Sequence, residues 1–444
     1  MTRVLLVSTG PVGRRMAGPG VRYFHLAREL ARRGSDVTLV APELPDVDVG
    51  VEVLPASRLP SRRFVRLARR YDAVLAQQLS PWTMWALAGS PAKVVYDLYD
   101  PLAVEVLPLL AEEPARAARA PTYRSVVLSQ LVALATGDAF VCASERQRDL
   151  WLGMLAALGR LDVDTYAADP TLRGLVDVVP FGLDPEPPAG GGALKGVVPG
   201  IGSDDRVLVW AGGIWSWFDP ETVVRAVAAV ARERGDVRLF FLGTAPPRGE
   251  LDLSSAAART RALAAELGLE GRHVFFNDGW VEYGERGRYL ADAELGVSAH
   301  FDSAETRFAF RTRLLDHFWA GLPTVATGGD VLGDLVAERR LGRAVAPRDV
   351  DAFAGALLEL LGDDAAYEEC RANVAAVRDE FAWPRVAARL AAVLEAPVAA
   401  PRPRPAARMA AAGSWHAARG VLARAGARAV AAQVVRTLRR PRVP

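Results

Sequence analysis

Residues 301–330 read FDSAETRFAFRTRLLDHFWAGLPTVATGGD, and the rest of the chain is organised around this stretch. Apolar residues spaced three to four apart predict a helix that begins near Arg311. Gly321 is expected to end this helix, and Pro323 prevents its continuation. A short buried strand over 324–327 and a glycine-rich turn complete the stretch.

Four charged side chains of this stretch suit a charged ligand that is rich in hydroxyl groups. Glu305 lies in the loop expected before the helix. Arg311 and Arg313 lie at the helix start, and Asp316 follows within one turn. Arginines at a helix N-terminus favour phosphate, whereas carboxylates accept hydrogen bonds from sugar or ribose hydroxyls. The alternative is a helix with a surface Arg313–Asp316 pair, which would contribute only about 0.2–0.5 kcal/mol.

Length, hydropathy and cysteine content predict a cytoplasmic protein of more than one domain. The chain has 444 residues, which favours two to three domains of ordinary size. Its two cysteines, Cys142 and Cys370, argue against a disulfide scaffold and suit a reducing compartment. The apolar run in MTRVLLVSTGP is too short for a signal-peptide core. No stretch approaches the ~18 uninterrupted apolar residues of a membrane-spanning helix.

The C-terminal residues differ from the rest in charge. Residues 402–444 hold ten arginines and no Asp or Glu. Proline and alanine over 397–413 predict a flexible linker. Residues 414–440 mix Trp415 and aliphatic side chains with arginines, which suits a basic helix lying on the anionic inner face of the membrane. The alternative is a disordered tail, and no nucleic-acid partner is expected.

Short apolar runs alternate with helical patterns along most of the chain. This alternation predicts parallel, doubly wound sheets with ligand sites at the carboxyl ends of the strands. A region rich in proline and glycine over 185–202 predicts domains of 1–184 and 185–379, followed by a linker and basic tail over 396–444. The expected strands are 4–7, 36–41, 73–76, 93–96, 139–142, 206–211, 237–242, 273–276, 295–299 and 324–327.

The stretch 301–330 resembles the donor motif of retaining GT-B glycosyltransferases of family 4, the glycosyl transferases group 1. In that motif a Glu, seven residues and a second Glu precede a small residue, Gly, any residue and Pro. Residues 316–323 fit its second half with Asp316 in place of Glu, and Glu305 fits the first half with ten intervening residues. The segment DVVPFGLD at 177–184 is similar to the strand that leads into the interdomain linker of these enzymes.

The resemblance implies the GT-B fold, with two Rossmann-like doubly wound parallel-sheet domains facing across a cleft. A helix over 380–395 would cross back onto the first domain. The implied activity is transfer of a glycosyl unit from a nucleotide-sugar to an acceptor hydroxyl, with retention and without a metal or cofactor. The acceptor would be a saccharide, a lipid-linked sugar or a small molecule, in the synthesis of a cell-surface polysaccharide, glycolipid or glycosylated metabolite.

On the donor side, Arg311 and Arg313 are the candidates for binding the diphosphate. Relatives usually carry Gly-Arg and then Lys after the strand that corresponds to 206–211, whereas GGIWSWFD here has neither cation. The two arginines would therefore have to neutralise the diphosphate. Other donor-side residues are Asp316 for the ribose, Glu305 for the donor sugar, and Gly212, Gly213, Trp215 and Trp280 as lining of the site.

On the acceptor side, relatives have a His-Asp pair after the strand that corresponds to 93–96. Tyr99 stands in place of that histidine here, so no histidine role carries over, and Asp97 and Asp100 are the candidates for binding hydroxyls. The alternative for Asp100 is a helix cap before the following proline. The remaining residues expected on this wall are Gly18, Pro19, Gly20 and Arg22, in a glycine-rich loop that could equally be a plain tight turn.

Three other functions remain open from the sequence. A nicotinamide-dependent oxidoreductase would place Glu43 on a ribose, although the first loop does not match G-x-G-x-x-G. An epimerase or phosphorylase would share the GT-B fold. A catalytically silent nucleotide-binding protein is allowed by the missing pair of cations after 206–211.

Overall fold

The computed structural model describes residues 1–244, 254–398 and 406–439, and these divide into two compact units. Unit 1 contains Met1–Phe181 and the described residues from Val386 onward. Unit 2 contains Gly182–Arg385. The first division falls three residues before the position expected from the sequence, and the second lies inside helix α16 (Trp383–Glu395).

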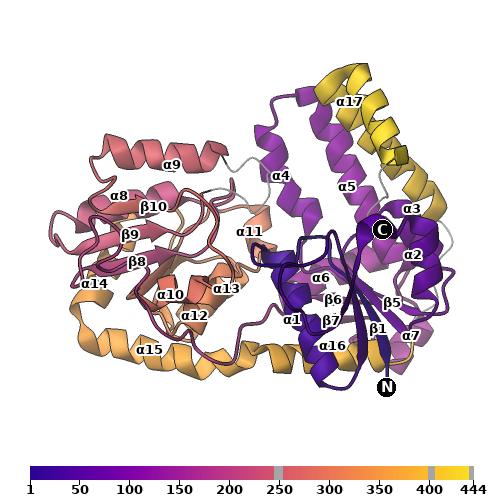
Figure 1. The fold of residues 1–444 in the computed structure, drawn as a ribbon, viewed down its shortest axis with the longest axis horizontal. Coiled ribbons are helices and arrows are strands. Elements are labelled where there is room, and N and C mark those ends of the chain that lie inside the picture. The colour runs from indigo at the N-terminus through magenta and orange to yellow at the C-terminus, as the bar shows by residue number, and fades with distance from the viewer. Residues whose placement is uncertain (245–253, 399–405, 440–444) are drawn as a thin grey trace. The chain divides into compact units, whose positions relative to one another are not determined.

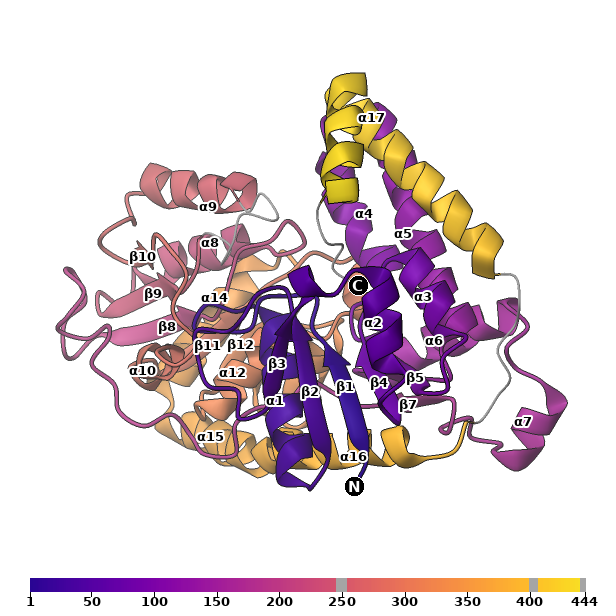
Figure 2. The same cartoon turned by 45° about the vertical axis from the view of Figure 1, so that its right-hand side comes forward.

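Unit 1 is built on a parallel sheet of seven strands in the order β3-β2-β1-β4-β5-β6-β7. Strands β3, β2 and β1 stand side by side in Figure 2. The inner strands are mostly apolar and buried because helices cover both faces of a doubly wound sheet. The strands are β1 (Arg3–Val7), β2 (Asp36–Ala41), β3 (Glu52–Pro55), β4 (Ala73–Ala76), β5 (Lys93–Asp97), β6 (Ala139–Cys142) and β7 (Val176–Val178).

The helices of unit 1 connect these strands. The start of α6 (Glu145–Ala157) shows how the local sequence begins a helix. The hydroxyl of Ser144 accepts a hydrogen bond from the backbone N–H of Gln147 at 3.2 Å and so caps the start of the helix at Glu145. The helices are α1 (Gly18–Arg32), η1 (Ala56–Arg58), α2 (Ser61–Ala68), α3 (Pro81–Leu87), α4 (Leu102–Glu112), α5 (Arg116–Thr136), α6 (Glu145–Ala157) and α7 (Val163–Ala168).

Unit 2 repeats the arrangement with a parallel sheet of six strands in the order β10-β9-β8-β11-β12-β13 (Figure 1). The strands are β8 (Arg206–Trp210), β9 (Val237–Phe241), β10 (Val274–Phe276), β11 (Leu295–Ser298), β12 (Thr324–Thr327) and β13 (Gly342–Val345). The helices are α8 (Pro220–Val230), α9 (Ser254–Glu266), α10 (Arg286–Ala291), α11 (Ala304–Phe308), α12 (Arg313–Trp319), α13 (Val331–Glu338), α14 (Val350–Gly362), α15 (Asp364–Arg378) and η2 (Asp379–Phe381).

Each sheet has one point at which the strand order reverses. In unit 1 it lies between β1 and β4, and in unit 2 between β8 and β11. In open parallel sheets, ligands bind outside the carboxyl ends of the strands at such a switch point. The loops after these four strands are therefore the first places to look for a site.

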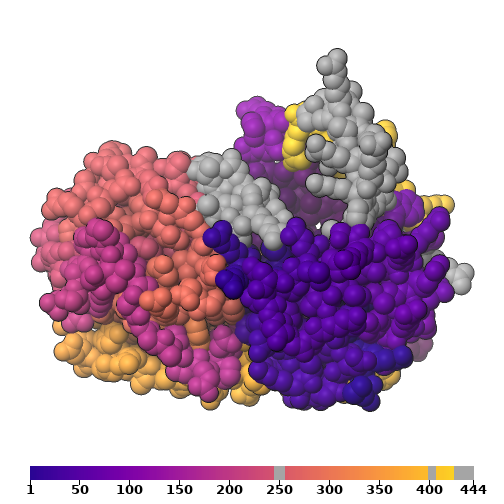
Figure 3. Space-filling model, viewed as in Figure 1, coloured from indigo at the N-terminus to yellow at the C-terminus, as the bar shows by residue number. Residues whose placement is uncertain are grey.

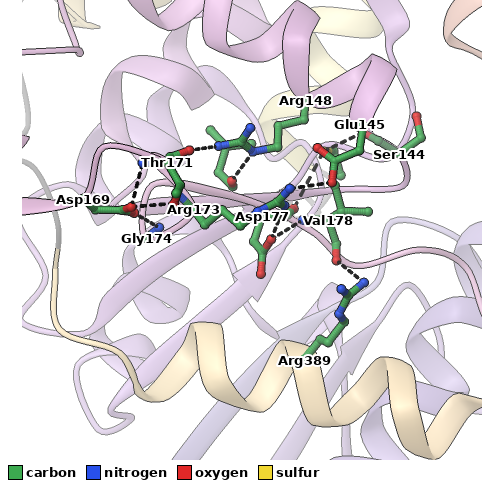
Figure 4. Close-up of polar contacts among 12 residues, drawn as sticks. Ser144, Glu145, Arg148, Asp169, Thr171, Arg173, Gly174, Asp177, Val178 and Arg389 are labelled. Atoms are coloured by element: carbon green, nitrogen blue, oxygen red, sulfur yellow. Dashed lines mark hydrogen bonds and ion pairs between the residues drawn. The ribbon is translucent and has the colours of Figure 1, made fainter. Parts of the chain in front are cut away.

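Helix α16 is fastened to the strands of unit 1 by two side chains. The guanidinium of Arg389 donates a hydrogen bond to the carbonyl oxygen of Val178 in β7 at 3.5 Å (Figure 4). The ammonium of Lys93 in β5 donates to the carbonyl oxygen of Ala396 at 2.7 Å. Strand β7 is also held by an ion pair between Arg173 and Asp177, 2.9 Å apart, which belongs to a larger polar network (Figure 4).

The last helix, α17 (Ala406–Arg439), departs from the expectation of a linker over 397–413, because residues 406–413 are already helical. It packs along α5 (Figure 1), and Figure 3 shows yellow atoms of its described part beside violet atoms of the N-terminal half of the chain. Small residues permit the close approach: a Cβ at Gly413 would lie 3.3 Å from the Cβ of Leu128. Arg424 pairs with Glu113 at 2.5 Å. Among the described residues, α17 and every other helix are too short or too polar to cross a membrane.

Candidate functional site

The loop after β8 brings backbone atoms to the switch point of unit 2. Gly212 has a φ of +92°, a left-handed conformation that favours glycine. The following residues turn into α8, where Asp219 caps the helix by accepting a hydrogen bond from the N–H of Thr222 at 3.1 Å. The cap and the proline at the first helical position explain why α8 begins here. The carbonyl of Gly213 is left at the carboxyl edge of the sheet.

Arg313, at the start of α12, is a buried cation beside this loop. Its Nη2 donates a hydrogen bond to the carbonyl oxygen of Gly213 at 2.6 Å. The guanidinium lies 3.6 Å from the ring centroid of Phe218 and 4.5 Å from that of Trp210. Arg313 is 7% exposed, and within the described parts of the chain its Nη1 has no hydrogen-bond partner.

The electrostatic surroundings of Arg313 disfavour its charge. Burial holds the pKa of Arg313 well below its ordinary value, and the neighbouring positive charge of Arg311 lowers it further. The surface Arg313–Asp316 pair considered as an alternative does not form, because Arg313 turns inward to Gly213. Asp316 instead pairs with Arg286, with 3.2 Å between Oδ1 and Nε.

Arg311 differs from Arg313 in having a carboxylate partner. Its Nη2 lies 2.5 Å from Oε2 of Glu305, and both side chains are buried. Glu305 lies on the short helix α11, where the sequence predicts a loop, because Ser303 caps this helix by accepting from the N–H of Thr306 at 3.2 Å. Glu305 thus neutralises Arg311, whereas no described carboxylate pairs with Arg313.

Next to Arg311 lies a buried histidine–aspartate pair that the sequence analysis missed. Nε2 of His300 lies 2.8 Å from Oδ2 of Asp330, and the second oxygen of Asp330 caps α13 by accepting from the N–H of Leu332 at 2.8 Å. Nε of Arg311 lies 4.0 Å from Asp330. His300 follows β11 directly and Asp330 follows β12, so their place after two neighbouring strands was the signal that could have found them.

Two of the aromatic residues expected on the donor side lie in the loops around this site. Trp215 stacks on Trp217 with ring centroids 5.5 Å apart, and both are half-buried. Trp280 packs over the end of β9, where a Cβ at Gly243 would lie 3.3 Å from its ring and 3.6 Å from the carbonyl carbon of Gly212. Trp280 and the Gly212 turn therefore lie close together.

In unit 1, Arg22 does not line an open wall as expected. It is fully buried and donates to both carboxylate oxygens of Asp97, at 2.6 and 3.0 Å. Its other donors reach the carbonyl oxygens of Val179 at 2.9 Å and Pro180 at 2.7 Å. Asp97 lies 75 residues away in the sequence, so no local pattern announced the pair. Arg22 is a structural residue that ties α1 to the ends of β5 and β7.

The two glycines expected on the acceptor side differ in how closely other atoms pack against them. Gly18 and Pro19 are the first residues of α1. A Cβ at Gly20 would overlap the carbonyl oxygen of Pro11, so this glycine is required by close packing. A Cβ at Gly18 would meet its nearest atom, the hydroxyl oxygen of Tyr99, at an ordinary 3.4 Å.

Asp100 borders a cavity of about 520 Å³ at the switch point of unit 1. Burial and the negative charge of Asp97 raise the pKa of Asp100 to about 7. The cavity is lined by Thr9, Gln77, Gln78, Leu79, Ser80, Pro81, Asp97, Leu98, Asp100, Leu102, Ser129, Gln130 and Ala133. Elsewhere, no cluster of three or more His, Cys, Asp or Glu side chains among the described residues could hold a metal ion.

Comparisons with known proteins bear on both units. Residues 205–363, within unit 2, match the family model described as glycosyl transferases group 1. No curated protein sequence matches the chain.

Solved structures resemble the chain over most of its length. A sucrose-phosphate synthase from Thermosynechococcus elongatus has a TM-score of 0.62 at 17% identity, over 88% of this chain and 98% of that one. The Anabaena protein HepE in complex with UDP-glucose has a TM-score of 0.60 at 15% identity, over 89% and 99%. The trehalose-6-phosphate synthase OtsA has a TM-score of 0.64 at 13% identity, over 89% and 100%. The chain therefore has the GT-B fold, and its residues 205–363 match the model of the glycosyl transferases group 1 family.

Proposed function

We propose that this protein is a retaining glycosyltransferase that moves a sugar from a nucleotide diphosphate-sugar to an acceptor hydroxyl. The observation that carries the proposal is the buried guanidinium of Arg313, which has no carboxylate partner among the described residues. An uncompensated buried charge destabilises a protein by several kcal/mol. Such a residue is understandable where a ligand supplies the opposite charge.

The position of Arg313 favours a diphosphate as that ligand. It lies beside the turn at Gly212 and Gly213, at the switch point where parallel sheets bind nucleotides. Arginine matches the geometry of phosphate oxygens through paired N–H donors. It would replace the two cations that relatives usually carry after the strand corresponding to β8. Arg311 contributes less charge because Glu305 already neutralises it.

The comparisons support the same class of donor. The matched family segment spans β8 to α14, which includes the whole candidate donor site. HepE, one of the structural neighbours, was solved in complex with UDP-glucose. We assign Trp280 to contact with the base, Asp316 to the ribose and Glu305 to the donor sugar. Asp316 is suitably placed, since its side chain is 34% exposed and Arg286 fixes its orientation.

The proposed reaction needs no separate catalytic base. The acceptor oxygen forms a bond to the anomeric carbon while the bond from that carbon to the diphosphate oxygen breaks. The bonding electrons leave with the diphosphate, and the acceptor proton passes to the departing oxygen on the same face of the sugar, which gives retention. The role of Arg313 is to stabilise the negative charge as it develops on the diphosphate. No metal or cofactor takes part in this proposal.

We place the protein in the cytoplasm, with peripheral attachment to an anionic membrane surface through α17. Trp415 is 65% exposed and Leu422 is 46% exposed on the part of α17 whose side chains are described. Exposed aromatic and aliphatic side chains beside arginines favour the interface of an anionic bilayer. The opposite side of the helix is taken up by α5.

The proposal is tested by thermal unfolding of the protein with UDP, GDP, ADP, dTDP or NAD. A ligand at one hundred times its Kd stabilises the folded state by about 2.7 kcal/mol. We expect one nucleoside diphosphate to do so for the wild type and not for Arg313→Met, which keeps the packing against Phe218 but has no charge. Arg288→Met is the matched control, because Arg288 is an exposed arginine of the same unit.

The outcomes separate the functions that the sequence left open. Stabilisation by NAD alone would refute a glycosyltransferase and favour an oxidoreductase. Nucleotide binding without release of sugar from any nucleotide-sugar would indicate a catalytically silent protein. Equal stabilisation of the Arg313 and Arg288 variants would remove Arg313 from the donor site.

A further inference from the structure

The cavity of unit 1 is a built site at the place where the sheet order reverses. It opens beyond the carboxyl ends of β1, β4 and β5, which contribute Thr9, Gln77 and Asp100, respectively. Helix α5 closes another side with Ser129 and Gln130. The volume of about 520 Å³ falls in the range of small-molecule sites.

Two side-chain amides in this cavity present acceptor oxygens that have no partner. Gln130 is only 3% exposed, and within the described residues its Oε1 accepts no hydrogen bond. Oε1 of Gln78 is likewise buried and without a partner there. Buried polar atoms are nearly always hydrogen-bonded in proteins. Two such atoms in one cavity therefore indicate a ligand that brings hydrogen-bond donors.

The other polar groups of the cavity form a chain that ends on a carboxyl group. The hydroxyl of Thr9 donates to Oε1 of Gln77 at 2.6 Å. Nε2 of Gln77 in turn donates to Oδ2 of Asp100 at 3.4 Å. The donors of Thr9 and Gln77 are thus directed within the cavity wall, and Asp100 remains an acceptor for a ligand.

The same cavity lacks positive charge. None of its thirteen lining residues, all of them within the described part of the chain, is Lys, Arg or His. The guanidinium of Arg22, which contacts the lining residue Asp97, is also bound to two backbone carbonyl oxygens. A phosphate group in this cavity would meet carbonyl oxygens and a carboxyl group, which are the wrong partners for an anion.

We propose that this cavity binds an uncharged, hydroxyl-rich ligand through Gln78, Gln130 and Asp100, and that the acceptor is therefore an unphosphorylated saccharide or related polyol. This inference rests on the proposed glycosyltransferase function and narrows its acceptor. Sugar hydroxyls supply the donors that the amide oxygens lack, and the apolar side chains of Leu79 and Leu102 suit the faces of a sugar ring.

The test uses pairs of sugars that differ only by a phosphate group, on the full chain and without nucleotide. Glucose is compared with glucose 6-phosphate, and N-acetylglucosamine with its 6-phosphate, by calorimetric titration up to 100 mM. We expect at least one neutral sugar to bind at least tenfold more tightly than its phosphate. Gln130→Met should weaken that binding at least tenfold, because it keeps the volume of the side chain and removes the acceptor oxygen.

Asn373→Leu is the control, since this exposed amide lies in unit 2 and its loss should leave sugar binding unchanged. The inference is overturned if the phosphorylated sugars bind equally well or better, if Gln130→Met binds like the wild type, or if no neutral sugar binds. The sugar titrations contain no nucleotide, so any of these results would leave the proposed role of Arg313 in donor binding unaffected. Conversely, if the protein binds a sugar but no nucleotide, the proposed glycosyltransferase function is refuted and the proposed sugar site in unit 1 is not.

Discussion

The guanidinium of Arg313 donates to the carbonyl oxygen of Gly213 at 2.6 Å, and among the described residues this is its only hydrogen bond. The carbonyl of Gly213 holds the guanidinium in position without neutralising its charge. An anionic ligand can therefore supply the opposite charge. A buried charge without a counter-charge lowers the stability of the unliganded protein, and binding of an anionic ligand offsets that loss.

Arg313→Met should make the unliganded protein more stable, although it removes donor binding. Replacing a buried charge by an apolar side chain of similar volume is often stabilising by about 1–4 kcal/mol. For a domain of this size, each kcal/mol corresponds to a rise in Tm of about 2–4 °C. Differential scanning calorimetry without nucleotide measures the change. A lower Tm for the variant would mean that the guanidinium is compensated within the protein.

Glu305→Gln should have the opposite effect, because it leaves the buried Arg311 without its carboxylate at 2.5 Å. Breaking a buried ion pair by removing one partner typically destabilises by about 3–5 kcal/mol. Urea unfolding provides the measurement. Glu285→Gln is the matched control, since its pair with Arg288 is exposed and should contribute less than about 1 kcal/mol. Similar losses in the two variants would contradict a special role for the buried pair.

Asp100 should make unit 1 less stable as the pH rises. Its pKa is raised to about 7 in the folded chain, above the ordinary value of 3.8. The folded state therefore holds more protons than the unfolded state between these values, and its stability falls as the pH rises from about 4 to about 7. The raised pKa of the neighbouring Asp97 acts in the same direction.

Asp100→Asn should flatten that dependence, and the free energy of unfolding at pH 5 and pH 8 measures it. Asp72→Asn is a suitable comparison, because the pKa of Asp72 is lowered by its hydrogen bonds to Arg3. If the wild type and Asp100→Asn lose the same stability between the two pH values, Asp100 does not titrate in this range.

Gly20→Ala should destabilise unit 1, whereas Gly18→Ala should be tolerated. A Cβ at Gly20 would overlap the carbonyl oxygen of Pro11, and relief by movement of the backbone costs about 1–3 kcal/mol. At Gly18 the nearest atom would be 3.4 Å away. The two variants differ by only two positions in one helix, so a comparison of their Tm values isolates the effect of packing. Equal Tm values would show that the loop shifts freely.

The protein should bind vesicles that contain anionic lipid and not vesicles of neutral lipid alone. Trp415→Ser should weaken this binding several-fold, because the exposed indole is the largest apolar group on the described side chains of α17. Co-sedimentation with vesicles of 30% phosphatidylglycerol measures it. Trp82→Ser, at an exposed tryptophan of α3, serves as the control. Loss of binding in both variants alike would assign the contact to a wider surface than α17.

Much of the fold could be predicted because its signals are local. Strands β6 and β12 have the bounds expected from their apolar runs. Strand β3 was not expected, since it lies at the edge of the sheet and has only four residues, which begin with Glu52 and end with Pro55. The short helix α11 was expected as a loop, because five residues show no helical period.

The candidate sites were harder to predict because their contacts are distant in sequence. Arg22 finds its partner Asp97 far along the chain, and the distance between Arg313 and Gly213 in sequence is 100 residues. Gln130 lies within a long helix and carries no motif, so only the fold shows that its amide faces a cavity. The residue types of the donor stretch were recognisable, whereas the assignment of charge between Arg311 and Arg313 required the structure.

The path of the chain through α16 has a consequence for synthesis of the protein. Unit 2 is one continuous segment, Gly182–Arg385, whereas unit 1 needs segments from both ends of the chain. Domains generally fold as units while the chain emerges from the ribosome. Unit 2 can therefore complete its fold first, and unit 1 must wait for α16 and α17. A truncated product that stops before α16 would leave Lys93 in β5 and the carbonyl of Val178 in β7 without these partners, and would be a natural target for cellular quality control.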